Sequence, residues 1–233
     1  MHLSDAHHFR KMVAGACMVL APLVLLVATV VHPEAKTDEA AQLAVIADNL
    51  DAWLAAHLLA LAAIALSVPA VLGLMHMLRE REVSLGHVGG GLAMLGLLAY
   101  VGVVAVEGLV GWAMGDAGDR GAMVALLTSV NASAAIVIPF FIVSLAFAVG
   151  MICLALGLYR ARAVQSWMAI CLAVGAVLLA IGGLSAATWL GIVAAAFLLV
   201  GFGSIGRMVY RESDEAWEHT PEYEGFRPVP GMR

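Results

Sequence analysis

The sequence predicts an all-α, polytopic membrane protein with six transmembrane helices in three hairpins and both termini in the cytoplasm. Two observations predict this class. Hydrophobic residues make up 63% of the 233 residues and charged residues only 12%, whereas a soluble domain averages about half apolar and about a quarter charged. The apolar residues also gather in long runs, and a transmembrane helix needs roughly 20 of them to cross about 30 Å of hydrocarbon.

Six apolar segments are long enough to span a bilayer, and they define a membrane domain over about residues 1–211. The first segment follows two basic residues, as in a signal peptide, but its apolar run is too long for one and further spans follow. We therefore expect it to stay as a permanent helix. The six spans cover about residues 12–32, 52–78, 87–114, 134–158, 164–183 and 186–206.

The lysines and arginines predict the orientation, because the span ends that carry them stay in the cytoplasm. With both termini inside, only Lys36 and Arg120 lie outside. The ten inner cations are Arg10, Lys11, Arg79, Arg81, Arg160, Arg162, Arg207, Arg211, Arg227 and Arg233. The excess of ten over two favours this topology.

Three of the spans end in similar sequences, which favours three stacked hairpins: "LGLMHMLRERE", "LALGLYRARAV" and "IGRMVYRESDE". An internal repeat is one explanation of this rhythm. The other is that any helix ending inside finishes with interfacial side chains and with arginines long enough to reach water.

Two loops on the expected outer side predict short amphipathic helices. Residues 37–53 open with a capping residue and two acids, and then place Leu43, Ile46 and Leu50 at helical spacing. Residues 119–131 repeat this pattern with Met123, Leu126, Leu127 and Val130. These two helices either cover the outer end of the bundle or lie at the membrane interface.

The composition also limits the partners. A net charge of −5 without a long basic block argues against binding to nucleic acid. The lipid bilayer surrounds the spans, and other membrane subunits or further copies of this chain are the expected protein partners. Residues 212–233 predict an acidic cytoplasmic tail, which is mobile unless a partner subunit holds it.

A single carboxylate, Glu107, lies within the apolar run "VVAVEGLVGW" of the third span. Such a carboxylate turns inward, pairs or stays protonated, because exposing it to lipid is costly. At 1.5 Å per residue, Glu107 lies about 12 Å below the outer end of its span and His57 about 9 Å below the outer end of the second. We expect the two side chains at similar depth, where a hydrogen bond between them would fix the packing of the helices.

Further polar side chains near the outer ends extend this site. His32 closes the first span, and Tyr100 and Gly111 share a helical face with Glu107. The sequence therefore predicts a buried polar pocket in the outer half of the bundle, formed by His57, Glu107, His32, Tyr100, Asp116 and Trp112.

Three functions fit such a pocket. The first is a non-enzymatic protein, either an accessory subunit of a membrane complex or a small-ligand binder. The second is a redox protein with a metal ion held by His57, Glu107 and His32, or with a haem between the two histidines, because imidazole and carboxylate suit zinc, iron and copper. The third is a proton-coupled transporter, because intramembrane carboxylates and histidines commonly mark proton paths.

Other motifs indicate no chemistry. The three cysteines, Cys17, Cys153 and Cys171, lie far apart in apolar runs, as small buried hydrophobes do. The segment "GFGSIG" spells G-x-G-x-x-G, but it closes an apolar helix with no strand before it, so close helix packing explains it. No H-E-x-x-H or G-x-S-x-G occurs, and the sequence therefore does not indicate an enzyme.

Three segments resemble a set of uncharacterised bacterial integral membrane proteins with six predicted spans: "FRKMVAGACMVLAPLVLLVATVVHP", "AVIADNLDAWLAAHLLAL" and "LGHVGGGLAMLGLL". The resemblance covers most of the chain. It implies the six-span topology and a multi-pass protein of the bacterial inner, or cytoplasmic, membrane. It implies nothing about site residues, because that set has no established activity.

Overall fold

The computed structural model describes residues 3–183, 185 and 187–220, and these residues form helices and no strand. The third long helix, α4 (Val83–Ala105), continues through a π-helical turn, η1 (Val106–Val110), into the short helix α5 (Gly111–Asp116). The long helices are α1 (Leu3–Val31), α3 (Leu50–Met77), α4 (Val83–Ala105), α7 (Ala134–Arg160), α8 (Ser166–Gly183) and α9 (Thr188–Arg211).

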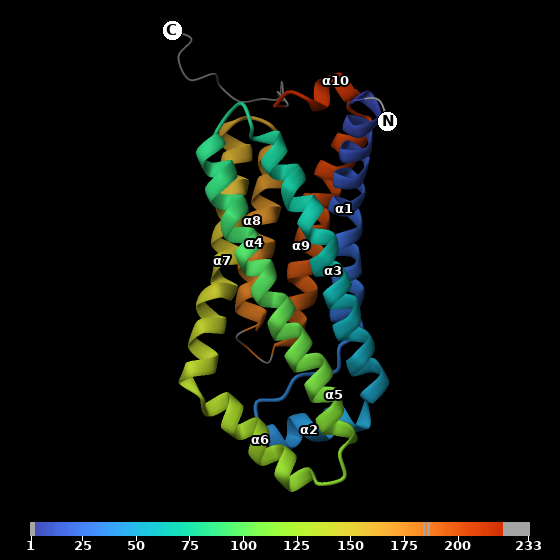
Figure 1. Ribbon diagram of the computed structural model, residues 1–233, viewed down its shortest axis with the longest axis vertical. Coiled ribbons are helices and arrows are strands. Elements are labelled where there is room, and N and C mark those ends of the chain that lie inside the picture. Colours follow the sequence, from blue (N-terminus) through green and yellow to red (C-terminus); the bar gives the residue numbers. More distant parts are fainter. Residues whose placement is uncertain (1–2, 184, 186, 221–233) are drawn as a thin grey trace.

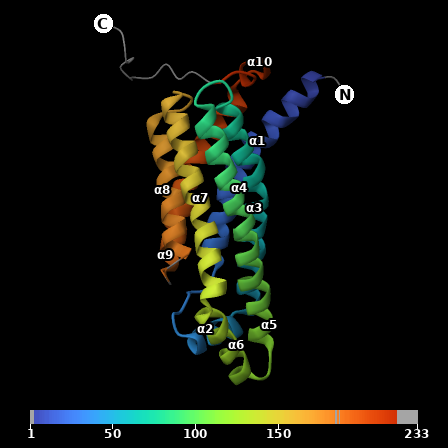
Figure 2. The same ribbon diagram turned by 60° about the vertical axis from the view of Figure 1, so that its left-hand side comes forward.

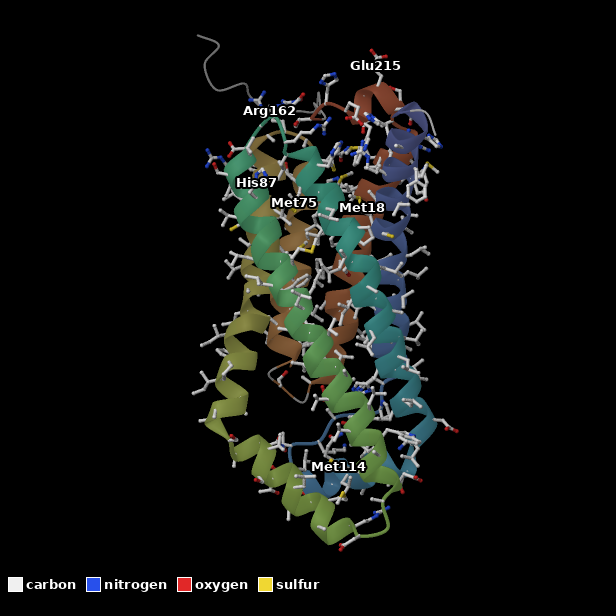
Figure 3. The ribbon with its side chains drawn as sticks, in the orientation of Figure 1. Met18, Met75, His87, Met114, Arg162 and Glu215 are labelled. Atoms are coloured by element: carbon white, nitrogen blue, oxygen red, sulfur yellow. The ribbon has the colours of Figure 1, made fainter. Side chains whose placement is uncertain are left out.

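The long helices form a closed ring that runs α1, α3, α4, α7, α8, α9 and back to α1 (Figures 1 and 2). Each helix packs against the one before it and the one after it in this order. One end of the ring carries α10 (Asp214–Trp217), and the other carries α2 (Glu39–Asp48) and α6 (Arg120–Ala132). We call these the α10 end and the α6 end. Figure 3 shows Arg162 and Glu215 at the α10 end and Met114 near the α6 end.

Five helical stretches among the described residues are long and apolar enough to cross a membrane, and each coincides with a predicted span. This is the pattern of a multi-pass membrane protein. The predicted span 134–158 falls on α7, where the apolar stretch found among the described residues, Leu145–Arg160, is shorter than the others. The five stretches are Ala6–Val31, Leu50–Met77, Val83–Asp116, Ser166–Gly183 and Thr188–Arg211.

Glycines bring α4 and α7 into close contact in the half of the bundle near the α10 end. A Cβ atom built on Gly150 would lie 2.3 Å from the backbone nitrogen of Ala93 and 2.6 Å from the carbonyl oxygen of Gly89. A Cβ atom on Gly96 would lie 2.4 Å from the backbone nitrogen of Phe147. Small residues allow such backbone approach, which is a main source of helix association in membranes.

The two predicted amphipathic helices are present at the α6 end. The side chain of Asp38 caps α2 by accepting a hydrogen bond from the backbone N–H of Ala41 at 2.8 Å. Leu43 and Ile46 are buried as the spacing predicts, whereas Leu50 already belongs to α3. Asp119 caps α6 in the same way, through the N–H of Ala122 at 3.0 Å. The cap of α2 is thus Asp38 rather than the first residue of the predicted segment.

The described part of the predicted tail folds back onto the bundle. Residues 212–220 lie across the α10 end, and the side chain of Trp217 is only 3% exposed. The ring of Trp217 stacks on that of His76 with centroids 4.5 Å apart, and the Nε2–H of His76 donates to the carbonyl of Trp217 at 2.9 Å. Up to Thr220 the chain itself therefore holds the tail. Residues 221–233, which include Arg227 and Arg233, lie outside the described residues.

A buried lysine ties the start of the chain to this segment. Lys11 is 5% exposed, and its ammonium donates to the carbonyl of Glu212 at 2.8 Å and pairs with the carboxylate of Asp214. The hydrogen bond from Lys11, followed by one from His8, lowers the pKa of Asp214 below its ordinary value. Residues before the first predicted span therefore extend α1 into the water-facing layer, where polar pairs hold them.

Candidate functional site

A cavity of about 640 Å³ lies between the long helices, and its lining extends from His32 and Thr188 near the α6 end to Leu198 and Phe202 farther along α9. This volume is in the range of small-molecule sites, roughly 300–1,000 Å³. Phe147, Leu198 and Phe202 line the cavity with other apolar side chains from α1, α3, α4, α7 and α8. The polar side chains in its lining are Thr29, His32, His57, Ser67, Tyr100, Glu107, Asn131, Ser185 and Thr188.

The structure brings four of the six predicted pocket residues to this cavity. They are His32, His57, Tyr100 and Glu107, which come from three different segments of the chain. Trp112 and Asp116 are not part of the lining. Both belong to α5, beyond the π-helical turn, and Asp116 is exposed at the end of that helix.

The π-helical turn η1 presents Glu107 to the cavity. Such turns contain one more residue per turn than an α-helix and often occur at functional sites. The indole N–H of Trp53 donates to the carbonyl of Gly108 at 3.1 Å, which ties the turn to α3. A Cβ atom on Gly108 would lie 2.4 Å from the Cβ of His57. The absence of a side chain at position 108 therefore lets η1 rest directly on His57.

His57 is buried, and a backbone hydrogen bond fixes its tautomer. Its Nδ1 lies 2.8 Å from the carbonyl oxygen of Trp53. Because a carbonyl only accepts, Nδ1 carries the proton, and the Nε2 of the neutral ring keeps its lone pair. His32 repeats this arrangement, with its Nδ1 2.7 Å from the carbonyl oxygen of Pro33.

The two histidines and Trp53 form one aromatic cluster. The ring centroids of His32 and His57 are 5.1 Å apart, and those of Trp53 and His57 are 4.5 Å apart. A neutral His32 ring with its proton on Nδ1 keeps a lone pair on Nε2.

Glu107 is exposed at the cavity rather than buried in the packing between helices. Among the described residues, its carboxylate has no hydrogen bond or ion pair. The hydrogen bond that the sequence predicts between Glu107 and His57 is not formed, because His57 donates instead to its own helix. The two residues share a cavity and do not bond to each other.

The predicted metal site is not assembled. Over the ranges 3–183, 185 and 187–220, no three His, Cys, Asp or Glu side chains are close enough to hold a metal ion. This includes the predicted set His57, Glu107 and His32. The rings of the two histidines lie against each other at a tilt of 52°, and so do not face one another across the space that a haem would fill.

Five polar lining residues are outside the predicted set, Thr29, Ser67, Asn131, Ser185 and Thr188, and the sequence carries a signal for the first two. Ser67 lies on the same face of α3 as His57, because the lining residues of that helix recur at helical spacing: His57, Ala60, Ile64, Ser67 and Val71. Thr29 lies three residues before His32 on the last turn of α1. Reading each span for a face of small and polar residues would have found both.

Comparisons with protein-family models, with curated proteins and with solved structures find no match for this chain. The fold and the cavity therefore define its class. It is a helical, multi-pass membrane protein with a mostly apolar cavity between its helices and a small set of polar groups in the cavity lining.

Proposed function

We propose that this chain is a non-enzymatic protein of the bacterial inner membrane that holds a small ligand in its cavity. In this proposal the chain spans the membrane six times, with both termini in the cytoplasm and the cavity in the outer half. Ligand binding is favoured over the alternatives by one observation, which is the cavity of about 640 Å³ with polar groups at one side and apolar walls elsewhere.

The distribution of basic residues supports the orientation. Lys36 and Arg120 lie at the α6 end, whereas the predicted inner cations in the described part of the chain belong to segments at the α10 end. The length of α7 supports the fourth predicted span, and with it a total of six, because 27 residues at 1.5 Å each extend about 40 Å.

The shape of the cavity favours binding over transport. Phe147, Leu198 and Phe202 line it near the middle of the bundle, and the apolar core continues from there toward the α10 end with Met18, Leu74 and Met151. A proton path requires polar side chains or water along its whole length. The polar groups of the cavity therefore serve a ligand that enters and leaves on the same side.

The hydroxyl groups favour a non-enzymatic role. The hydroxyl of Thr29 donates to the carbonyl of Leu26 at 2.9 Å, and that of Ser67 donates to the carbonyl of Ala63 at 2.8 Å. A serine or threonine nucleophile instead donates its proton to a base such as histidine. Neither hydroxyl has that arrangement.

We expect a bulky side chain at position 60 to abolish binding, because Ala60 lines the cavity one turn below His57. The measurement is equilibrium dialysis of protein in lipid nanodiscs, with empty nanodiscs subtracted. The probes are octylammonium, octyltrimethylammonium, octanoate and 2-octanone. At least one of them is expected to bind saturably, with one molecule per chain, and Ala60→Phe is expected to lose this binding.

The matched control is Ala55→Phe, because Ala55 is an exposed alanine on the same helix that does not line the cavity. It is expected to bind the probe as the unchanged protein does. Saturable binding that survives Ala60→Phe, or the lack of saturable binding for all four probes, would contradict the proposed function.

A further inference from the structure

Among the described residues, the lining of the cavity carries a single acidic or basic side chain besides its histidines, the carboxylate of Glu107, and it contains no lysine or arginine. Within the described part of the chain this carboxylate has no hydrogen bond or ion pair. A carboxylate in largely apolar surroundings is stabilised by a positive charge placed close to it. The cavity thus has an unbalanced charge that a cationic ligand would neutralise.

The hydrogen-bond donors beside Glu107 are already used within the protein. The hydroxyls of Thr29 and Ser67 donate to backbone carbonyls of their own helices. The Nδ1–H groups of His32 and His57 donate to the carbonyls of Pro33 and Trp53. Lone pairs on the hydroxyl oxygens and on the two Nε2 atoms are what these side chains retain for a ligand.

Three other polar side chains of the cavity are less restricted. Tyr100 and Asn131 can donate to a ligand, and the hydroxyl of Thr188, which accepts from the N–H of Ala35 at 3.3 Å, keeps its proton free to donate. Tyr100 and Asn131 lie on α4 and α6, whereas Thr188, at the start of α9, lies beside the segment that follows α1, as its hydrogen bond with Ala35 shows. They can accommodate an acceptor atom in the ligand, whereas the two histidines themselves offer it only the lone pairs of their Nε2 atoms.

The remainder of the cavity fits a hydrocarbon chain. From the polar groups it continues toward the middle of the bundle along Ile64, Val71 and Leu97, and it ends among Leu198 and Phe202. A ligand with its polar head at Glu107 would therefore place an apolar chain against these side chains, where burial removes hydrocarbon from contact with water.

We propose that the ligand is an amphiphile with a cationic head that donates hydrogen bonds, such as a primary alkylammonium. The head contacts the Glu107 carboxylate and the Nε2 atoms of His57 and His32, and the chain fills the apolar part of the cavity. This inference rests on the proposed function, and it adds the chemical class of the ligand.

The four octyl probes separate charge from hydrogen-bond donation, since octyltrimethylammonium has the charge and no N–H. We expect octylammonium to bind at least tenfold more tightly than octanoate or 2-octanone. The affinity of octyltrimethylammonium is expected to lie between that of octylammonium and those of the other two probes. We expect Glu107→Gln to weaken octylammonium binding at least tenfold. Asp116→Asn removes a carboxylate at the same end of the bundle but outside the cavity, and it is expected to leave binding unchanged.

A second pair of variants tests the histidine. His57→Phe keeps a ring of similar size and removes the lone pair, so it is expected to weaken octylammonium binding more than octyltrimethylammonium binding. His87→Phe is the matched control, because the Nδ1 of His87 likewise donates to a carbonyl one turn earlier, that of Val83 at 2.9 Å, on an exposed site outside the cavity.

The outcomes distinguish this inference from the proposed function. Binding that is lost in Ala60→Phe, but is equal for octanoate and octylammonium or unchanged in Glu107→Gln, would overturn the inference and leave the proposed function standing. Failure of all four probes to bind saturably would overturn both. The preference of the unchanged protein among the four heads decides the question even if a variant fails to fold.

Discussion

Replacing Gly150 with alanine is expected to destabilise the bundle strongly, because the added methyl group has no space between α4 and α7. The new Cβ would lie 2.3 Å from the backbone nitrogen of Ala93 and 2.6 Å from the carbonyl of Gly89. Backbone atoms cannot rotate away as a flexible side chain does, so α4 and α7 must separate along their contact. Overpacking costs about 1–3 kcal/mol, and we expect the upper end of this range.

The thermal midpoint of the purified protein in detergent measures this effect. A loss of 2 kcal/mol or more corresponds to a fall of roughly 5 °C in a chain of this size. Gly203→Ala in α9 is the matched control, because the nearest atom to its Cβ would be the Cδ1 of Leu199 at an ordinary 3.7 Å. This control is expected to be neutral or slightly stabilising, since alanine favours helix over glycine by about 1 kcal/mol. Equal midpoints for the two variants would contradict the close packing of α4 on α7.

Replacing Trp217 with alanine is expected to release residues 212–220 from the α10 end. Its side chain is 3% exposed and stacks on His76, so the change removes the largest apolar contact of this segment. Truncating a buried aromatic side chain to alanine costs about 3–5 kcal/mol. The segment docks through its own contacts, so we expect local release and not unfolding of the bundle.

Cleavage after Glu215 by a glutamyl endopeptidase, followed by mass spectrometry, reports this release. We expect the rate to rise about 100-fold or more, because 3 kcal/mol of lost docking changes the open population by that factor. Trp189→Ala, at a tryptophan that is 63% exposed, is the control and should leave the rate unchanged. An unchanged rate in Trp217→Ala would show that polar contacts alone hold the segment.

The positions of the spans could be predicted from hydropathy, because apolar runs long enough to cross a bilayer have no other stable environment. The start of α1 and the segment that follows α9 could not be predicted from hydropathy. Lys11 and Asp214 are far apart in sequence, and their pairing is a tertiary contact at the α10 end. Hydropathy places both residues in water and gives no reason for α1 to begin as early as Leu3.

The site could be predicted in composition but not in geometry. The sequence predicts His57 and Glu107 at equal depth on neighbouring helices, and both residues line one cavity in the structure. The predicted shared face of Glu107 and Gly111 assumed an unbroken α-helix, with about 100° per residue. The π-helical turn between them changes this relation, so that Gly111 packs against Trp53 while Glu107 is exposed. The local sequence contains no pattern that predicts a π-helical turn.

Photolabelling tests the central claim, which is that the cavity holds an amphiphile with its cationic head at Glu107 and its hydrocarbon chain among the apolar side chains. The probe is an alkylammonium with a diazirine at the end of its chain, applied to the protein in nanodiscs and mapped by peptide mass spectrometry. The structure predicts labels on Ile64, Val71 and Leu198, and their loss in excess octylammonium and in Ala60→Phe. Labels confined to lipid-facing side chains such as Leu72 and Leu98, unaffected by octylammonium, would contradict the account.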